Sequence, residues 1–140
     1  MRKKYNNSVI FSTRIPANGI EEIAKMIEKH FEYDLIVAYK VYISGAISGV
    51  EYSTCKEKFE KSELEIRKLK VKEGYKPIPI NPLELLHSRD KSWKSYLRED
   101  LKWLKKCDAI YMQKDWRDSR GATLELWFAK RYNKVVYFEI

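Results

Sequence analysis

From Lys40 onward, short apolar runs alternate with longer segments in which apolar residues recur every three or four positions. Short runs rich in Val, Ile and Tyr are typical of buried strands, and the wider spacing is typical of a helix with one face in a core. The pattern predicts strands at residues 40–44, 76–80, 108–112 and 134–140, separated by helices at residues 53–73, 91–106 and 121–132.

Strands that alternate with helices along a chain form a parallel sheet, because each helix carries the chain back to the start of the next strand. We therefore expect an α/β fold, with an open, mainly parallel sheet sandwiched by helices. Residues 1–39 contain an apolar run at 8–15 and an amphipathic segment at 19–31. They are expected to form an N-terminal β-α extension of the same domain, whose main part is residues 40–140.

Local signals suggest where the helix at residues 53–73 begins and ends. Thr54 and Glu57 have the spacing of a capping box, in which each side chain bonds a free backbone N–H of the first turn. Gly74 follows the last periodic residue, where helices often end.

Composition narrows the class of protein. The chain has 140 residues and a net charge of +8, but its lysines and arginines alternate with acids, as on a solvated helix face. A nucleic-acid partner is therefore not expected, whereas a small anionic ligand such as a nucleotide fits the charge. The sequence contains no apolar run long enough for a membrane span. Its two cysteines have neither metal-site nor disulfide spacing, which favours a reducing, cytoplasmic setting.

Glu125 lies near the start of the last predicted helix, on the side that should face the core. At 3.6 residues per turn it shares this side with Gly121, Phe128, Ala129 and Tyr132. A carboxylate there is unfavourable unless it is paired, hydrogen-bonded or used in chemistry. Two interpretations stay open: a snorkelling or salt-bridged glutamate, and a functional carboxylate.

Asp100 is a second acid on the apolar face of a predicted helix, the one that precedes the helix of Glu125. It falls between Tyr96, Leu97 and Leu104 on the apolar stripe. The ordinary alternative is a buried carboxylate that caps a neighbouring loop, so this residue by itself does not indicate a function.

The stretch from Tyr42 to Gly49, YISGAISG, places two glycines between a predicted strand and a helix. Backbone N–H groups of such a loop are open to an anion, because glycine has no side chain to block the approach. Ser119 and Gly121 form a second turn of this kind, also after a strand and at a helix start. Each of them alone also fits an ordinary tight turn.

These features all fall at the carboxyl ends of strands or on helices beside them, where open α/β sheets bind ligands. Two carboxylates, a tyrosine and two phosphate-sized loops suit glycosyl transfer from a nucleotide. One carboxylate attacks the anomeric carbon, a second acid assists the departure of the base, and the loops hold the 5′ end of the nucleotide.

The motifs VYISGAISG, YLREDLKWLKKCDAIYM and SRGATLELWFA resemble the nucleoside 2-deoxyribosyltransferase superfamily, in particular its small bacterial and phage members and its deoxynucleoside 5′-monophosphate N-glycosidases. The resemblance covers about residues 40–140. It implies a Rossmann-like fold, a nucleoside or nucleotide as the small-molecule partner, and a homodimer or higher even oligomer. No cofactor and no metal ion are expected.

The resemblance also implies roles for individual residues. Glu125 would be the nucleophile that forms a covalent glycosyl-enzyme, Asp100 the second catalytic acid, and Tyr42 the hydroxyl that bonds near the nucleophile. The implied substrate- and phosphate-binding residues lie in the two loops: Gly45, Ala46, Ile47, Ser48, Gly49, Ser119 and Gly121. The monophosphate-cleaving branch has an arginine where this chain has Ser48, and Arg120 is a candidate substitute.

The expected function is cleavage or base exchange at the N-glycosidic bond of a (deoxy)nucleoside or its 5′-monophosphate. Water as acceptor would make the protein a hydrolase, and a second base would make it a transferase. The alternatives are a glycohydrolase of NAD or a related signalling nucleotide, and a non-catalytic nucleotide-binding module. Two acids on apolar faces favour an enzyme, because a binding module gains little from burying them.

Overall fold

The computed structural model describes residues 19–34, 36–85 and 92–140, which belong to two compact units, residues 1–36 and 37–140. In the first unit, the amphipathic segment forms helix α1 (Ile20–Asp34). The apolar run at residues 8–15 lies outside the described residues, so the strand expected there, and with it the β-α extension, stays a prediction. Among the described helices, none is long and apolar enough to cross a membrane.

The second unit is built on a four-stranded sheet in which every neighbouring pair of strands is parallel. Its strands are β1 (Val37–Ser44), β2 (Tyr75–Ile80), β3 (Ala109–Met112) and β4 (Val135–Phe138). They lie in the order β2-β1-β3-β4. The predicted α/β fold with an open parallel sheet is therefore confirmed, with β1 beginning at Val37 rather than at Lys40.

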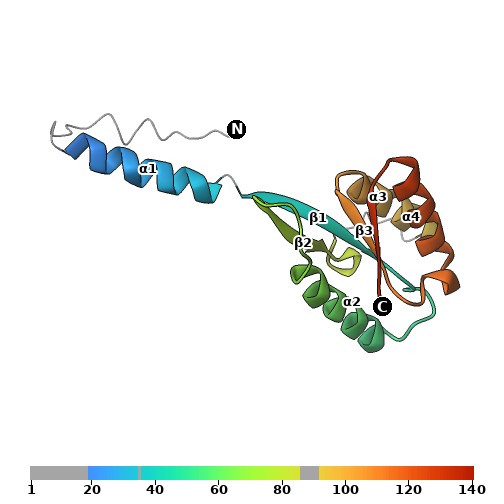
Figure 1. Cartoon of the computed structure of the whole chain (residues 1–140). Helices are drawn as coiled ribbons and strands as arrows, with labels where there is room; N and C mark the ends of the chain where they lie inside the picture. Colours follow the sequence, from blue (N-terminus) through green and yellow to red (C-terminus); the bar gives the residue numbers. More distant parts are fainter. Residues whose placement is uncertain (1–18, 35, 86–91) are drawn as a thin grey trace. The chain divides into compact units, whose positions relative to one another are not determined.

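Helices cover both faces of this sheet, as Figure 1 shows: α2 on one face, and α3 and α4 on the other. The bounds are α2 (Tyr52–Arg67), α3 (Trp93–Lys105) and α4 (Arg120–Arg131), with short 3-10 turns η3 (Pro82–Glu84) and η4 (Trp116–Asp118). Each strand sends alternate side chains to opposite faces, so that β1 contributes to two cores. Val41 and Ile43 pack under α2, and Tyr42 packs under α3 and α4.

Helix α2 begins at Tyr52, within one residue of the prediction, but the predicted capping box and the predicted end at Gly74 were wrong. Glu51 precedes the helix and makes no side-chain cap, and Thr54 and Glu57 lie inside the first turns instead of forming a capping box. The helix ends when the N–H of Lys68 bonds back to the last carbonyls. Gly74 instead occupies the turn before β2, with φ of 86°, and its carbonyl accepts the N–H of Val37.

The strand order explains where a ligand site can form. After β1 the chain moves outward to β2, and after β2 it crosses to the other side of β1 to form β3. Consequently the loops that leave β1 and β3 lead to helices on opposite faces and diverge. In open α/β sheets such a switch point opens a crevice at the carboxyl ends of the strands.

Candidate active site

A pocket of about 520 Å³ opens at this switch point, between the loops that follow β1 and β3 and the helices α3 and α4. Pockets of this volume are typical of small-molecule sites. Its wall includes most of the residues that the sequence predicted: Gly45, Ile47, Ser48, Asp100, Ser119, Gly121 and Glu125. The remaining predicted residues, Tyr42, Ala46 and Gly49, lie outside this wall.

Glu125 is held at the base of the pocket by two hydroxyl groups. Its side chain is 6% exposed, and both carboxylate oxygens accept a hydrogen bond from β1. The Tyr42 hydroxyl donates to Oε2 at 2.7 Å, and the Ser44 hydroxyl donates to Oε1 at 2.6 Å. The bond expected from Tyr42 is therefore present, and Tyr42 supports Glu125 from beneath the pocket.

Ser44 was missed by the sequence analysis, although the strand pattern contained the signal. Side chains two residues apart in a strand point to the same face, about 6.6 Å apart. Since Tyr42 was expected to approach Glu125, Ser44 should have been expected beside it. The two hydroxyls together fix the orientation of the carboxyl group.

Burial dominates the electrostatics of this group. Desolvation raises the pKa of Glu125 to about 8, although the hydrogen bonds from Ser44 and Tyr42 act in the opposite direction. The charge of Asp100 is a smaller contribution to this rise. Burial, followed by the charge of Glu125, holds the pKa of Tyr42 well above its usual range, so that its hydroxyl remains a donor. Among the described residues, no Lys or Arg forms an ion pair with Glu125.

Asp100 lies on α3 and is 9% exposed, as its place on the apolar stripe predicted. It lines the pocket together with Glu125, and its charge acts on both Glu125 and Tyr42. On the same helix, Trp93, Tyr96 and Leu97 also line the pocket and offer an aromatic and apolar wall. The two predicted acids therefore belong to one site.

The N-terminus of α4 contributes another part of the pocket wall. Ser119 caps the helix by accepting the N–H of Ala122 at 3.1 Å, and Gly121 leaves space beside the indole nitrogen of Trp93. The guanidinium of Arg120 stacks on the Trp93 ring, 4.5 Å from its centre. Positive charge, from the helix end and from Arg120, is thus placed beside the pocket.

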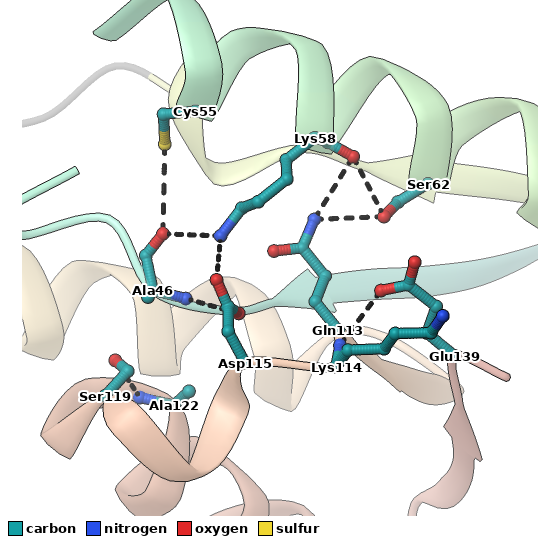
Figure 2. A network of polar contacts seen from close by, with 10 residues as sticks. All are labelled: Ala46, Cys55, Lys58, Ser62, Gln113, Lys114, Asp115, Ser119, Ala122 and Glu139. Carbon is teal, nitrogen blue, oxygen red and sulfur yellow. Dashed lines mark hydrogen bonds and ion pairs between the residues drawn. The ribbon is translucent and has the colours of Figure 1, made fainter. Parts of the chain in front are cut away.

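The loop after β1 is held from the α2 side by a polar network that the sequence analysis did not identify (Figure 2). Lys58 of α2 forms an ion pair with Asp115, and both residues bond the backbone of Ala46. The N–H of Ala46, predicted to hold phosphate, donates to Asp115 instead. No local pattern relates Lys58 to Asp115, because the two are far apart in sequence.

A metal centre was not expected from the sequence. Within the described part of the chain, no group of three His, Cys, Asp or Glu side chains is placed to hold a metal ion. Both cysteines are free and buried, and burial raises the pKa of the Cys107 thiol to about 12, so that it stays protonated.

A family model described as a domain of unknown function (DUF4406) matches residues 39–138. The chain belongs to this family. The matched range includes Tyr42, Asp100 and Glu125, together with the loops that form the pocket. No curated protein and no solved structure matched the chain. The description of DUF4406 gives no activity.

Proposed function

We propose that the protein cleaves or exchanges the N-glycosidic bond of a (deoxy)nucleoside or its 5′-monophosphate, with Glu125 as the nucleophile. The observation that carries the proposal is the placement of Glu125. It is buried at a pocket, oriented by two hydroxyl donors, and accompanied by a second carboxyl group that lines the same pocket. The resemblance of the three sequence motifs to nucleoside 2-deoxyribosyltransferases points to the same chemistry.

The reaction takes two steps. A Glu125 carboxylate oxygen forms a bond to the anomeric carbon while the carbon–nitrogen bond breaks, and the electron pair leaves with the base. Asp100 supplies the proton that the departing base needs. Water or a second base then attacks the same carbon and releases Glu125. Two displacements at one carbon retain the configuration of the sugar.

The environment of Glu125 favours its charged form most strongly during the reaction. Positive charge develops on the sugar as the base departs, and a carboxylate in a buried site stabilises that charge more than water would. Tyr42 and Ser44 keep the carboxylate oriented without neutralising it, because each donates only a hydrogen bond. The apolar wall formed by Trp93, Tyr96 and Leu97 suits the face of a nucleobase.

The pH dependence separates a nucleophilic role for Glu125 from an acidic one. With a pKa of about 8, roughly one Glu125 in ten is ionised at pH 7 in the empty pocket. If the carboxylate is the nucleophile, kcat/KM rises as the pH increases through about 8. A value of kcat/KM that falls over this range would identify Glu125 as a proton donor and would contradict the proposal.

The position of Arg120 favours a 5′-monophosphate as the substrate. Together with the N-terminus of α4, it places positive charge beside the pocket, where a 5′-phosphate can be held next to Ser119. Arg120→Gln is expected to raise KM about tenfold for 5′-monophosphates and to leave KM for nucleosides unchanged. An equal effect on both substrate classes would argue against a phosphate contact.

The decisive experiment is incubation with a panel of nucleosides, 5′-monophosphates and NAD, followed by chromatography for the released base. A second base in the mixture distinguishes exchange from hydrolysis. Rapid denaturation and mass spectrometry should find the sugar on the peptide that contains Glu125, and Glu125→Gln should abolish this adduct. Base release from NAD and from no other substrate would support the alternative of an NAD glycohydrolase. Nucleotide binding without release of any base would support a non-catalytic binding module.

An even-numbered assembly is also proposed. Large apolar side chains are exposed along α4 and the edge strand β4, namely Leu124, Trp127, Val135 and Phe138. Exposed apolar patches and unpaired strand edges are common at contacts between subunits. Light scattering at micromolar concentration should find a dimer or a higher even oligomer, and a monomer would contradict the proposal.

A further inference from the structure

Lys58 and Asp115 join the two loops that form the pocket, from the side opposite Glu125. Figure 2 shows the Lys58 side chain reaching from α2 toward the Ala46 carbonyl and Asp115. Lys58 Nζ forms an ion pair with Asp115 Oδ2 and donates to the carbonyl oxygen of Ala46 at 2.9 Å. The other oxygen of Asp115 accepts the Ala46 N–H at 3.2 Å. Both polar groups of the Ala46 backbone are therefore bound by one ion pair.

We propose that Lys58 and Asp115 are positioning residues that hold residues 45–49, the first part of the loop between β1 and α2, against the pocket, and so determine how tightly the substrate binds. The inference rests on the proposed function, since the substrate is the nucleoside or nucleotide named there. Neither residue lines the pocket, so neither is a catalytic residue.

The loop depends on these contacts because it lies beyond the sheet. The pairing of β1 with β3 ends at Ser44 and Met112. The turn at residues 47–50 is closed by the N–H of Val50, which donates to the Ile47 carbonyl at 3.2 Å. Gly45, Ile47 and Ser48, on either side of Ala46, face the pocket. A rotation of the Ala46 peptide would therefore displace the pocket wall directly.

Gln113 supports the loop at its first residue. A Cβ atom on Gly45 would lie 1.9 Å from Gln113 Oε1, so the two residues are in close contact and a larger residue at position 45 would displace the Gln113 side chain. The Gln113 amide donates to the Ser62 hydroxyl at 2.9 Å and to the Lys58 carbonyl at 3.3 Å. Gln113 consequently connects the loop to the same turn of α2 that carries Lys58.

The chain provides a matched control for Lys58. Lys61 lies one turn further along α2 and pairs with Glu139 at 3.7 Å, but its side chain is 67% exposed, against 27% for Lys58. Exposed pairs contribute little because water and salt screen them, whereas half-buried pairs with additional hydrogen bonds are screened less. Lys61→Met therefore removes the same charge from the same helix without touching the loop.

The first experiment requires no substrate. Amide hydrogen exchange is measured on the full chain for peptides covering residues 45–50 in the wild type, Lys58→Met and Lys61→Met. Exchange of the loop is expected to be about tenfold faster in Lys58→Met and unchanged in Lys61→Met, with β1 equally protected in all three. Unchanged exchange of the loop in Lys58→Met would overturn the inference, whether or not the protein has the proposed activity.

The second experiment uses the substrate that the panel identifies. Lys58→Met is expected to raise KM about tenfold and to change kcat by less than about twofold, because the loop contacts substrate and the reacting groups are untouched. Lys58→Arg should restore most of the binding, and Lys61→Met should match the wild type. An unchanged KM in Lys58→Met would overturn the inference even if loop exchange had increased. Failure of the proposed function would give a different result, because the wild type itself would then release no base from any substrate.

Discussion

Two carboxylates lie at the same edge of the sheet but on opposite faces, and their partners differ. Asp115, on the α2 side, has a lysine and a backbone N–H for its two oxygens. Glu125, on the α4 side, has two hydroxyls and a neighbouring acid, and burial raises its pKa to about 8. Asp115 is arranged as a partner in a structural contact, whereas Glu125 is held in an environment that opposes its charge.

This difference indicates that the folded state is destabilised at Glu125 and not at Asp115. A buried carboxylate without a cation destabilises the folded state in its charged form, and such groups concentrate at functional sites. Pairing Glu125 with a lysine would remove that destabilisation, but it would also neutralise the charge needed to face a developing cation. Removal of the charge should therefore affect turnover strongly only at Glu125, and should change stability in opposite directions at the two residues.

The largest expected effect is on turnover. Glu125→Gln preserves the shape of the side chain, and the new amide can still bond both hydroxyls, but it cannot form the glycosyl intermediate. Base release should fall by a factor on the order of a thousand or more, measured by chromatography under saturating substrate. Asp115→Asn, the matched change on the other face, should leave kcat within a few-fold. Comparable losses in the two variants would remove the proposed distinction between the carboxylates.

The same substitution, Glu125→Gln, should lower turnover but increase the stability of the fold. The pKa of Glu125 is raised from 4.5 to about 8 on folding, so between these values the unfolded chain has lost a proton that the folded protein retains. The free energy of unfolding therefore falls as the pH rises from about 4.5 to 8, by an amount on the order of a few kcal/mol from this group. Glu125→Gln removes this dependence. Urea unfolding should find the variant more stable than the wild type at pH 8 and no such gain at pH 4.

Asp115→Asn is the control for the sign of this effect. It removes the charge that pairs with Lys58 and leaves only one acceptor oxygen for Lys58 and the Ala46 N–H, and should lower the free energy of unfolding at pH 8. If both variants were destabilised at pH 8, Glu125 would be a structural residue like Asp115.

A smaller effect is expected when Asp100 loses its charge. Asp100→Asn cannot supply a proton to the departing base, so turnover should fall about a hundredfold for poorly leaving bases and less for bases that leave readily. The measurement is a series of substrates ranked by the acidity of the free base. A uniform loss across the series would assign Asp100 to shaping the pocket and not to proton transfer.

The fold was predictable because its signals are local. Alternating apolar runs and helical periods identified all four strands of the sheet and the three helices that cover it. The end of α2 was not predictable from Gly74, because the chain folds back at Lys68 and packs Leu69 against the core under α2. That tertiary contact overrides the local signals.

The candidate site was predictable only in part. Glu125 and Asp100 stood out as acids on apolar faces, and their burial followed from helical periodicity alone. Ser44 could have been found from its spacing to Tyr42. The pairing of Lys58 with Asp115, and the contact of Gly45 with Gln113, join residues from different elements. Such pairs depend on how α2 packs on the sheet, which no short sequence pattern specifies.

The smallest expected effect concerns the hydroxyls that hold Glu125. The hydrogen bond from Ser44 lowers the pKa of Glu125, so Ser44→Ala should raise that pKa beyond about 8. The increase of kcat/KM with pH should then shift to higher pH, by up to about one unit. The plateau that kcat/KM reaches at high pH should change less than about tenfold. Lys61→Met, whose ion pair lies on the other face of the sheet, should leave the profile in place. A profile unchanged in Ser44→Ala, or shifted to lower pH, would mean that the group controlling the rate is not Glu125, and the contrast with Asp115 would then concern stability alone.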